Sequence, residues 1–536
     1  MTSAATTPGL TFAIVPRSAE VSPLRTDVAG FIGRTKRGLA GEPVRVEEWR
    51  GYLREFGGLL KDSSTTYAVR GYFENGGEVA SMVRLCGEGS RTASAVWKVG
   101  ELDSGGQWTA GSPATFAFAR YQVEATSPGA WANGARVVIR YRLRGASDEP
   151  EVDIAVQAPD EPAESFSGLS LDNLELAIKS RSLMIRLKPE MPAQSGPVSP
   201  GPHQIEWELT LQDGVETPPS KQDYLDAVGK IGDGGKSEQA TAPGLEVALN
   251  AVPGLYEDLA NSDEQEEVLG ALIDQAEQLH DRLVLVDIPT DTEDRTDAIK
   301  EVSEVIQWIT RLRDSDRSEA LRAAAIYHPR VWVPDPLGGI ANPLRSVPPS
   351  GHVAGLISRL DRQRGAHHTP ANAPLYEAVD VTRAFDLAGQ ARFHNEGVNL
   401  VRCFPGRGLM VWGGRTADLR REMLFVAHRR LIHRLIRVIR RVTEPLVFDV
   451  NGPELWLTIA RAITTELLEA WRAGALKGAR PDEAFRVRCN ETTTPPEEQD
   501  LGRVFCEIEI APAVPMEFIL LRVALSTEGQ LEVIEP

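Results

Sequence analysis

The residues of this chain offer few patterns that could support chemistry. The segment Gly229–Ser237 is similar to a phosphate-binding loop, but that motif has four residues between its first glycine and the closing GK[ST]. Five residues separate Gly229 from Gly235 here, and no apolar strand leads into the segment. We therefore interpret the segment as part of a linker.

The histidines and serines form no recognisable active site. His367 and His368 lie in a loop-like stretch without acidic or thiol neighbours at ligand spacing. His428 and His433 are five residues apart, so they do not share a helix face as a zinc pair does. The chain has no GxSxG segment, and spacing does not test a Ser/His/Asp triad built from distant positions. We expect no catalytic residue, no metal site and no cofactor.

The cysteines are widely spaced along the chain. Cys86, Cys403, Cys489 and Cys506 include no CxxC pair. This spacing argues against a zinc ribbon and against a disulfide scaffold, and it favours reduced thiols.

The strongest charge pattern is a predicted helix from Asp418 to Val442. Eight arginines against Asp418 and Glu422 give this helix a charge of +6, whereas the whole chain has a net charge of −18. We expect so basic a helix to meet an acidic surface, and the alternatives are a solvated face or arginines that pair inside the same subunit. Nucleic-acid binding ranks lower, because no aromatic residues alternate with the arginines to stack on bases. The candidate contact residues are Arg429, Arg430, Arg434, Arg437, Arg440 and Arg441.

The length and composition of the chain indicate a globular protein with several domains. The 536 residues are 42% hydrophobic and 25% charged, which is typical of globular chains and sufficient for three or four packed units. The acidic surface disfavours nucleic acid and anionic membranes. No run of 18 apolar residues and no signal-like N-terminus is present, so we expect synthesis in the cytoplasm and no direct membrane insertion.

The hydrophobic periodicity changes twice along the chain. Residues 28–83 are mixed α/β, and residues 95–215 alternate apolar and polar side chains as antiparallel strands with one solvated face do. From about residue 246 the pattern becomes βαβ-like. A capping box of Ser262 and Gln265 opens a predicted helix, and the apolar run Leu283–Ile288 predicts a strand buried on both faces.

Both ends of the chain are predicted to be strands without a nearby partner. Leu10, Phe12 and Ile14 alternate with small or polar residues near the N-terminus. Near the C-terminus Leu531 and Val533 flank Glu532, and the apolar Ile534 makes that alternation only partial. Strands of this kind can add to a sheet of a neighbouring subunit through backbone hydrogen bonds. We therefore predict two inter-subunit arms.

Three long segments are similar to one known family. Residues 324–372, 397–416 and 467–519 resemble the contractile tail sheath proteins of phages and of phage-tail-like injection systems. In the middle segment, NLVRCFPGRGLMVWGGRT resembles the family stretch NVIR-x-FPGRG-x-x-VWGART. Such long, ordered similarity is more specific than any short motif.

The resemblance implies a multi-domain α/β fold. It consists of a discontinuous subtilisin-like α/β core, an inserted antiparallel β domain, a C-terminal α/β sheath domain and extended arms. The predicted boundaries are 1–20 for the N-terminal arm, 21–95 for the first part of the core, 96–215 for the β domain, 216–245 for a linker, 246–388 for the subtilisin-like domain, 389–520 for the sheath domain and 521–536 for the C-terminal arm.

The resemblance also implies a structural role. Sheath subunits form stacked hexameric rings around an inner tube and contract from a metastable extended state, which drives the tube into a target. The implied partners are further copies of the chain, the inner tube protein, and baseplate and tail-terminator or cap proteins. Assembly is expected in the bacterial cytoplasm, and the basic helix could face the tube or a neighbouring subunit. The alternatives are a hydrolase on the subtilisin-like core and a static sheath-like baseplate or collar component.

Overall fold

Apolar runs bounded by turn residues produce the centre of the molecule, a mostly parallel sheet. The computed structural model describes residues 24–99, 117–143, 151–170, 173–195, 203–232, 247–289, 298–314, 317–420, 423–443, 446, 450–513, 519–525 and 531–534. Leu10, Phe12 and Ile14 of the predicted N-terminal arm lie outside these residues.

The central sheet has nine strands within the described residues, in the order β16-β19-β18-β13-β12-β11-β1-β3-β2. Six neighbouring strands from β18 to β3 are parallel, and antiparallel strands flank them at both sides. The run predicted to be buried on both faces is β12, and every residue of it is buried. The strands are β1 (Ala29–Gly33), β2 (Val44–Glu47), β3 (Val79–Arg84), β11 (Leu249–Ala251), β12 (Leu283–Asp287), β13 (Ala324–His328), β16 (Ala373–Pro374), β18 (Val398–Phe404) and β19 (Gly408–Trp412).

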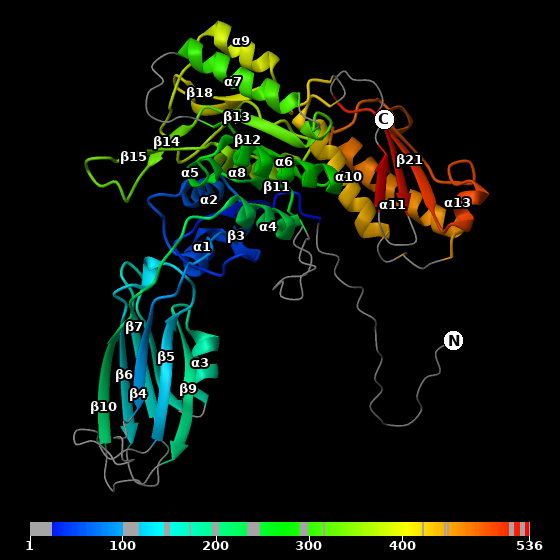
Figure 1. The fold of residues 1–536 in the computed structure, drawn as a ribbon. Coiled ribbons are helices and arrows are strands. Elements are labelled where there is room, and N and C mark those ends of the chain that lie inside the picture. The colour runs from blue at the N-terminus through cyan, green and yellow to red at the C-terminus, as the bar shows by residue number, and fades with distance from the viewer. Residues whose placement is uncertain are drawn as a thin grey trace, which may run out of the picture.

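Helices cover both faces of this sheet and form two apolar clusters (Figure 1). One cluster joins the sheet to α4 (Lys221–Gly232), α6 (Ser262–Leu279), α7 (Ala298–Arg313) and α9 (Leu387–Asn395). The other joins it to α1 (Glu48–Phe56), α2 (Ser64–Glu74) and α8 (Ser350–Arg364). A small antiparallel sheet lies beside the second cluster, with the strands β14 (Val331–Pro334), β15 (Leu344–Val347) and β17 (Asp380–Val381).

Two local predictions in this region are wrong. The segment predicted as a linker at 216–245 contains α4, whose Tyr224, Ala227 and Ile231 are buried against the sheet at helical spacing. The frequent Gly, Asp and Lys residues obscured that period. The cap of α6 is Asn261, whose side chain accepts a hydrogen bond from the Asp263 amide, so Ser262 and Gln265 do not form the predicted capping box.

Residues 94–210 form two antiparallel sheets that pack face to face over a shared apolar cluster. The chain enters and leaves this two-sheet unit through one neck, where main-chain hydrogen bonds join Gly87 to Thr217, Arg91 to Val215 and Ser94 to Gln212 (Figure 1). The elements are β4 (Ser94–Val99), β5 (Ala117–Ala125), β6 (Arg136–Leu143), β7 (Glu151–Gln157), β8 (Glu164–Ser170), α3 (Leu174–Arg181), β9 (Ile185–Ser195) and β10 (His203–Thr210).

The C-terminal part is a four-stranded antiparallel sheet packed on two helices. The helices are α10 (Val426–Thr443) and α11 (Pro453–Arg472), and the strands are β20 (Phe485–Arg488), β21 (Val504–Ile510), β22 (Ile519–Leu525) and β23 (Leu531–Ile534). Short helices α12 (Pro481–Ala484) and α13 (Pro496–Asp500) complete it.

Two predictions about this part need correction. The strand that carries Leu531 and Val533 has a partner in its own chain, because β23 pairs with β22 and forms an edge of the sheet. The predicted boundary between residues 388 and 389 falls before β18, yet β18 and β19 hydrogen-bond into the central sheet. The core therefore continues to Trp412.

The prediction of four reduced thiols is also wrong. Cys489 follows β20 directly and is disulfide-bonded to Cys506 of β21, with 4.5 Å between their Cα atoms. The register explains the pairing, because Arg488 lies opposite Glu507 and the next pair along is Cys489 and Cys506. Sequence spacing carries no signal for such a cross-strand bond.

We expect this disulfide to stabilise the C-terminal sheet. It closes a loop between residues separated by 17 positions, and a loop of that size corresponds to about 3 kcal/mol of stabilisation. Replacement of both cysteines by alanine should lower the free energy of unfolding by that amount, measured by denaturant titration. Cys403→Ser, at an exposed free cysteine, is the control. If all four thiols of the chain unfolded without reductant react with a maleimide, the bond does not form.

None of the helices in the described ranges is long and apolar enough to cross a membrane.

Candidate functional site: an anchor for the N-terminal segment

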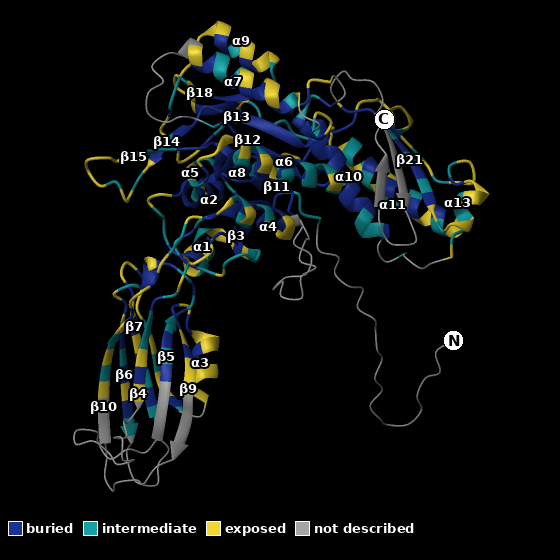
Figure 2. Ribbon diagram, viewed as in Figure 1, coloured by how far each residue is buried: buried dark blue, intermediate teal, exposed yellow. Residues whose placement is uncertain are grey.

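Three of the six arginines of α10 are buried inside the molecule. Arg429, Arg430 and Arg437 are 1%, 4% and 2% exposed, although they lie on the most basic helix of the chain. In Figure 2 α10 is drawn largely as buried and intermediate residues. A buried guanidinium must be paired with carboxylates or carbonyl oxygens to offset its lost hydration. The partners of these arginines therefore define what α10 does.

Arg430 connects three segments that are distant in sequence. Its guanidinium forms a two-pronged ion pair with Asp361 of α8, and its Nη2 also donates to the carbonyl oxygen of Thr26 at 2.8 Å. The Thr26 hydroxyl donates to Asp361 Oδ2 at 2.9 Å. The Arg430 and Asp361 side chains are only 4% and 3% exposed. Residue 26 is thereby fixed to both α8 and α10.

Arg437 lies two helical turns further along the same face of α10 and holds main-chain atoms. Its Nη1 donates to the carbonyl oxygen of Arg25 at 3.0 Å and its Nε to that of Asp281 at 2.9 Å, and Nη2 donates to the carbonyl of Val247. Val247 and Asp281 precede the central strands β11 and β12. One guanidinium thus connects residue 25 to the amino ends of two central strands.

The Asp281 carboxylate completes the charge balance at this end of α10. Arg440 Nη1 lies 2.5 Å from Asp281 Oδ2, and Arg282 Nε lies 2.8 Å from Oδ1. Burial on its own would raise the pKa of Asp281, but the charges of Arg282, Arg437 and Arg440 outweigh that effect and hold the pKa below its usual value. The carboxylate is therefore ionised at neutral pH.

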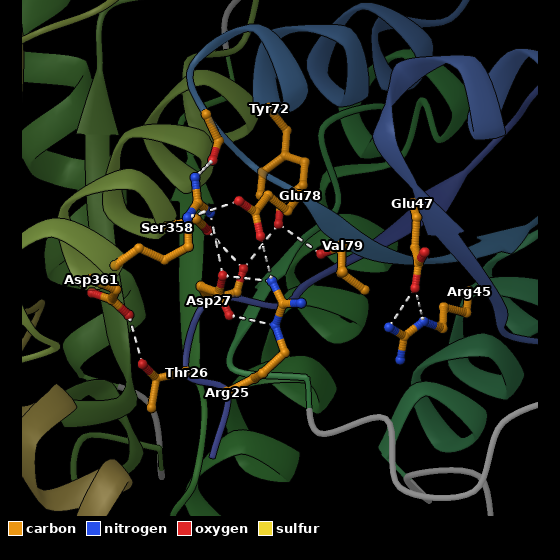
Figure 3. A network of polar contacts seen from close by, with 12 residues as sticks. Arg25, Thr26, Asp27, Arg45, Glu47, Tyr72, Glu78, Val79, Ser358 and Asp361 are labelled. Atoms are coloured by element: carbon orange, nitrogen blue, oxygen red, sulfur yellow. Dashed lines mark hydrogen bonds and ion pairs between the residues drawn. The ribbon is translucent and has the colours of Figure 1, made fainter. Parts of the chain in front are cut away.

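Asp27 is the third residue of the segment and is held through both its side chain and its carbonyl (Figure 3). Arg25 donates to the two carboxylate oxygens at 2.9 and 2.8 Å, and Arg362 of α8 donates to Oδ2 at 3.3 Å. Both arginines also pair with Glu78, each at 3.1 Å. The Asp27 carbonyl accepts from Ser358 Oγ at 2.8 Å and lies 2.9 Å from the Tyr72 hydroxyl.

The protonation state of Asp27 follows from these neighbours. Burial favours the neutral acid, but the hydrogen bonds and charges of Arg25 and Arg362 outweigh it and lower the pKa of the Asp27 carboxyl. We call Arg25, Thr26 and Asp27, with Asp361, Arg362, Arg430 and Arg437, the N-terminal anchor. It fixes the chain directly after the predicted N-terminal arm.

The anchor decides between the alternatives for the basic helix. Arg429, Arg430 and Arg437 are used inside the subunit, as the pairing alternative requires, and their burial leaves them no surface for a partner. Arg434 is half-buried, and its Nη2 lies 3.8 Å from a Glu466 oxygen on α11. A contact with the tube or a neighbouring subunit stays a prediction for Arg434, Arg440 and Arg441.

Sequence reasoning missed the two aspartates of the N-terminal anchor and the neighbouring Asp281. Asp27, Asp281 and Asp361 each stand alone in their segments, and the hydrogen bond from Arg430 to Thr26 spans 404 positions. The only usable signal was the excess of arginine on a helix with an apolar stripe, which requires buried counter-charges elsewhere.

The structure offers no catalytic triad among the described residues. Ser350 Oγ donates to Asp287 Oδ2 at 2.5 Å, but the serine is fully buried and no histidine bonds to either side chain in the described part of the chain. Burial raises the pKa of Asp287 to about 6. Asp287, the last residue of β12, also accepts a hydrogen bond from the Ser350 amide in the first turn of α8. No cluster of His, Cys, Asp and Glu in the described ranges could hold a metal ion.

Comparison with known proteins identifies the family. The phage tail sheath central domain matches residues 239–417, and the phage tail sheath C-terminal domain matches residues 420–526. The chain belongs to the phage tail sheath family. This family is one of structural proteins, which agrees with the lack of a catalytic arrangement expected from the sequence.

A curated relative and several solved structures resemble this sheath protein. The tail sheath protein of Vibrio phage KVP40 is 28% identical over 190 residues, which span 34% of this chain and only 27% of the relative. The sheath tail protein Lin1278 of Listeria innocua has a TM-score of 0.62 at 12% identity, with 94% of this chain and 95% of that chain covered.

The contracted helical sheath of the anti-feeding prophage is a further structural match. It has a TM-score of 0.54 at 20% identity, with 96% of this chain and 98% of that chain covered. These structural similarities show that the sheath fold extends over nearly the whole chain, the two-sheet unit included.

Proposed function

We propose that this sheath protein is the contractile subunit of a phage tail or of a phage-tail-like injection particle. It polymerises as stacked hexameric rings around an inner tube and contracts from a metastable extended state to drive the tube into a target. The observation that carries the proposal is the match to a contracted helical sheath over 96% of the chain. The parallel sheet is then the subtilisin-like core of the subunit, used as a scaffold.

The anchor gives this proposal a physical basis. An arm that holds a neighbouring subunit transmits load to its root. Here hydrogen bonds from Arg430 and Arg437 to the carbonyls of Thr26 and Arg25, and the ion pair of Asp27 with Arg362, fix the root to α10 and α8. At the other end, β23 lies at an edge of the C-terminal sheet and has one side free for strand addition within the described residues. A rigid body with fixed arm roots suits interfaces that rearrange while neighbours stay connected.

The partners and the setting follow from the same proposal. Further copies of the chain, the inner tube protein, and baseplate and cap proteins are the proposed partners, with assembly in the bacterial cytoplasm. A static baseplate or collar component is the second candidate, because the chain also matches a baseplate structure of the anti-feeding prophage with a TM-score of 0.52. One to a few rings per purified particle, counted by quantitative mass spectrometry, would favour this second candidate.

Negative-stain electron microscopy of the purified chain tests the proposal directly. Hollow, ridged tubes formed without any other protein are the expected result. Discrete particles at high concentration, both with and without tube protein, would contradict it.

Deletion of either arm should separate folding from polymerisation. Removal of residues 1–16 is expected to leave a folded subunit with an unchanged thermal transition, because the anchor begins at Arg25. Removal of residues 527–536 also deletes β23 and its pairing with β22, so the subunit should still fold, but with a less stable C-terminal sheet. Long tubes should be lost. Long tubes from either truncated chain, seen by electron microscopy, would show that the deleted arm does not join the subunits.

A further inference from the structure

The hairpin of β18 and β19 carries a rigid turn at its tip. Phe404, Pro405, Gly406 and Arg407 form this turn, in which the Arg407 amide donates to the Phe404 carbonyl at 3.0 Å. Gly406 has φ +75°, so proline at the second position and glycine at the third position match a type II turn. Phe404 lies opposite Gly408, which has no side chain to cover the ring. The tip thus presents its side chains on a fixed frame.

Four side chains of this hairpin form one cluster of aromatic rings and guanidinium groups. The rings of Phe404 and Trp412 are 5.0 Å apart between centroids. The Arg402 guanidinium lies 4.8 Å from the Phe404 ring and 5.5 Å from the Trp412 ring, and that of Arg407 lies 5.9 Å from Phe404. We call Arg402, Phe404, Arg407 and Trp412 the Arg–aromatic cluster.

The cluster is unusual for a surface that faces only water. Trp412 is 43% exposed, Arg407 is exposed, and Arg402 and Phe404 are half-buried. Within the described residues no carboxylate pairs with Arg402 or Arg407, although the chain has 76 acidic and 58 basic residues. Tryptophan and arginine held in place by stacking are the residue types that dominate binding energy at protein interfaces. A planar guanidinium fixed on a ring is also oriented in advance for a carboxylate.

We propose that the Arg–aromatic cluster binds a carboxylate-bearing surface of a second copy of this chain. The charge argument selects that partner. Arg402 and Arg407 have no carboxylate partner among the described residues, and an identical subunit of net charge −18 supplies an excess of carboxylates. This inference rests on the proposed function, in which copies of the chain assemble. It assigns a binding role to the hairpin that the arms and the anchor do not supply.

Variants of the cluster test the proposal by self-assembly of the purified full chain, with no tube protein present. Arg402→Glu and Trp412→Ala should each raise the concentration needed for tube formation by about tenfold or more, as expected for interface residues of this type. Arg50→Glu, which makes the same charge change at an exposed arginine of α1, and Leu176→Ala, at a 67% exposed leucine of α3, are the matched controls. Thermal unfolding of each variant checks that the subunit is folded, because Arg402 is half-buried whereas Trp412, Arg50 and Leu176 are exposed.

The outcomes separate this inference from the proposed function. If wild type forms no tubes, the proposed function fails. If wild type forms tubes and the cluster variants assemble at the control concentration, the cluster does not bind a second copy and the inference is overturned.

Cross-linking from Cys403 gives an independent measurement. Cys403 is exposed on the same hairpin, whereas the other free cysteine, Cys86, is half-buried and its burial raises the thiol pKa. A photoreactive maleimide on Cys403 should produce chain dimers in assembled tubes, with adducts on acidic peptides. Isotope-mixed tubes distinguish links between chains from links within one chain. Only intra-chain adducts in well-formed tubes would contradict the proposal.

Discussion

Arg430→Met is expected to lower the free energy of unfolding by about 3 to 5 kcal/mol, because it leaves the Asp361 carboxylate buried without its partner. The hydrogen bond to the Thr26 carbonyl is lost as well. Denaturant titration of the purified subunit measures the loss. Arg434→Met is the matched control on the same helix, because the ion pair of Arg434 with Glu466 is half-exposed. Ion pairs of that kind contribute about 1 kcal/mol or less to the free energy of unfolding.

A second variant separates the ion pair from the anchor itself. The double change Arg430→Met with Asp361→Leu removes both buried charges and should recover much of the lost stability. It should not restore the hold on residue 26, so trypsin is expected to cut after Arg25 faster than in wild type. A loss for Arg430→Met no greater than that for Arg434→Met would show that α10 does not anchor the N-terminal segment.

Acidification should destabilise the subunit between pH 6.5 and pH 4. Burial lowers the pKa of His352 and the pKa of His428 to about 4, from 6.5 for an exposed imidazole. Over this range the unfolded chain therefore binds more protons than the folded chain, and the folded state loses about 3 kcal/mol for each ring. The pKa of His433 is shifted in the same direction by burial and by Arg429, Arg437 and Arg430.

Three carboxyls act in the opposite sense, because burial raises the pKa of Asp258, of Glu216 and of Asp287. Because the pKa of Asp287 is raised to about 6, the folded chain takes up this proton first as the pH falls, and about 3 kcal/mol is regained. The two histidines with a pKa near 4, together with His433, outweigh these carboxyls, so the subunit is expected to lose stability as the pH falls from 6.5 to 4. Urea titrations at a series of pH values measure this slope.

His428→Leu identifies the source of the acid sensitivity. Neither ring nitrogen of His428 has a hydrogen-bond partner in the part of the chain that the structure describes, and the ring packs on Phe425, so leucine leaves no polar group there unpaired. The variant should be more stable than wild type at pH 5 and should show a flatter pH dependence. His394→Leu, at an exposed position on α9 where burial and Arg415 also lower the pKa of the imidazole, should flatten the slope less than His428→Leu does. An unaltered slope in His428→Leu would rule out this histidine as a source.

The parts of the fold that could be predicted from sequence are those set by local period. The apolar run at Leu283–Ile288 gave β12, and the alternation around Val137 and Leu209 gave β6 and β10. Helix α4 was missed because frequent glycine and aspartate obscured the spacing of its buried residues. The cross-strand disulfide was missed because it depends on the register of β20 with β21.

The site was less accessible to prediction than the fold. The excess of arginine on α10 was visible, but its direction was not, since a basic face looks the same in sequence whether it meets a partner or a buried aspartate. Asp361 and Asp281 become partners only after the chain has brought α8 and the start of β12 to α10. The Arg–aromatic cluster lies within the stretch that resembles the sheath family. The sequence of that stretch did not indicate that Trp412 is exposed.

The neck of the two-sheet unit makes that unit exchangeable. The chain leaves the core near Gly87 and returns beside it near Thr217, with a main-chain hydrogen bond of 3.0 Å between the two residues. The strand order of the central sheet therefore does not depend on what lies between them. A short turn, or a foreign domain whose own ends lie close together, would meet the same two joints. A different module could therefore occupy this position without a change to the central sheet or to the C-terminal part.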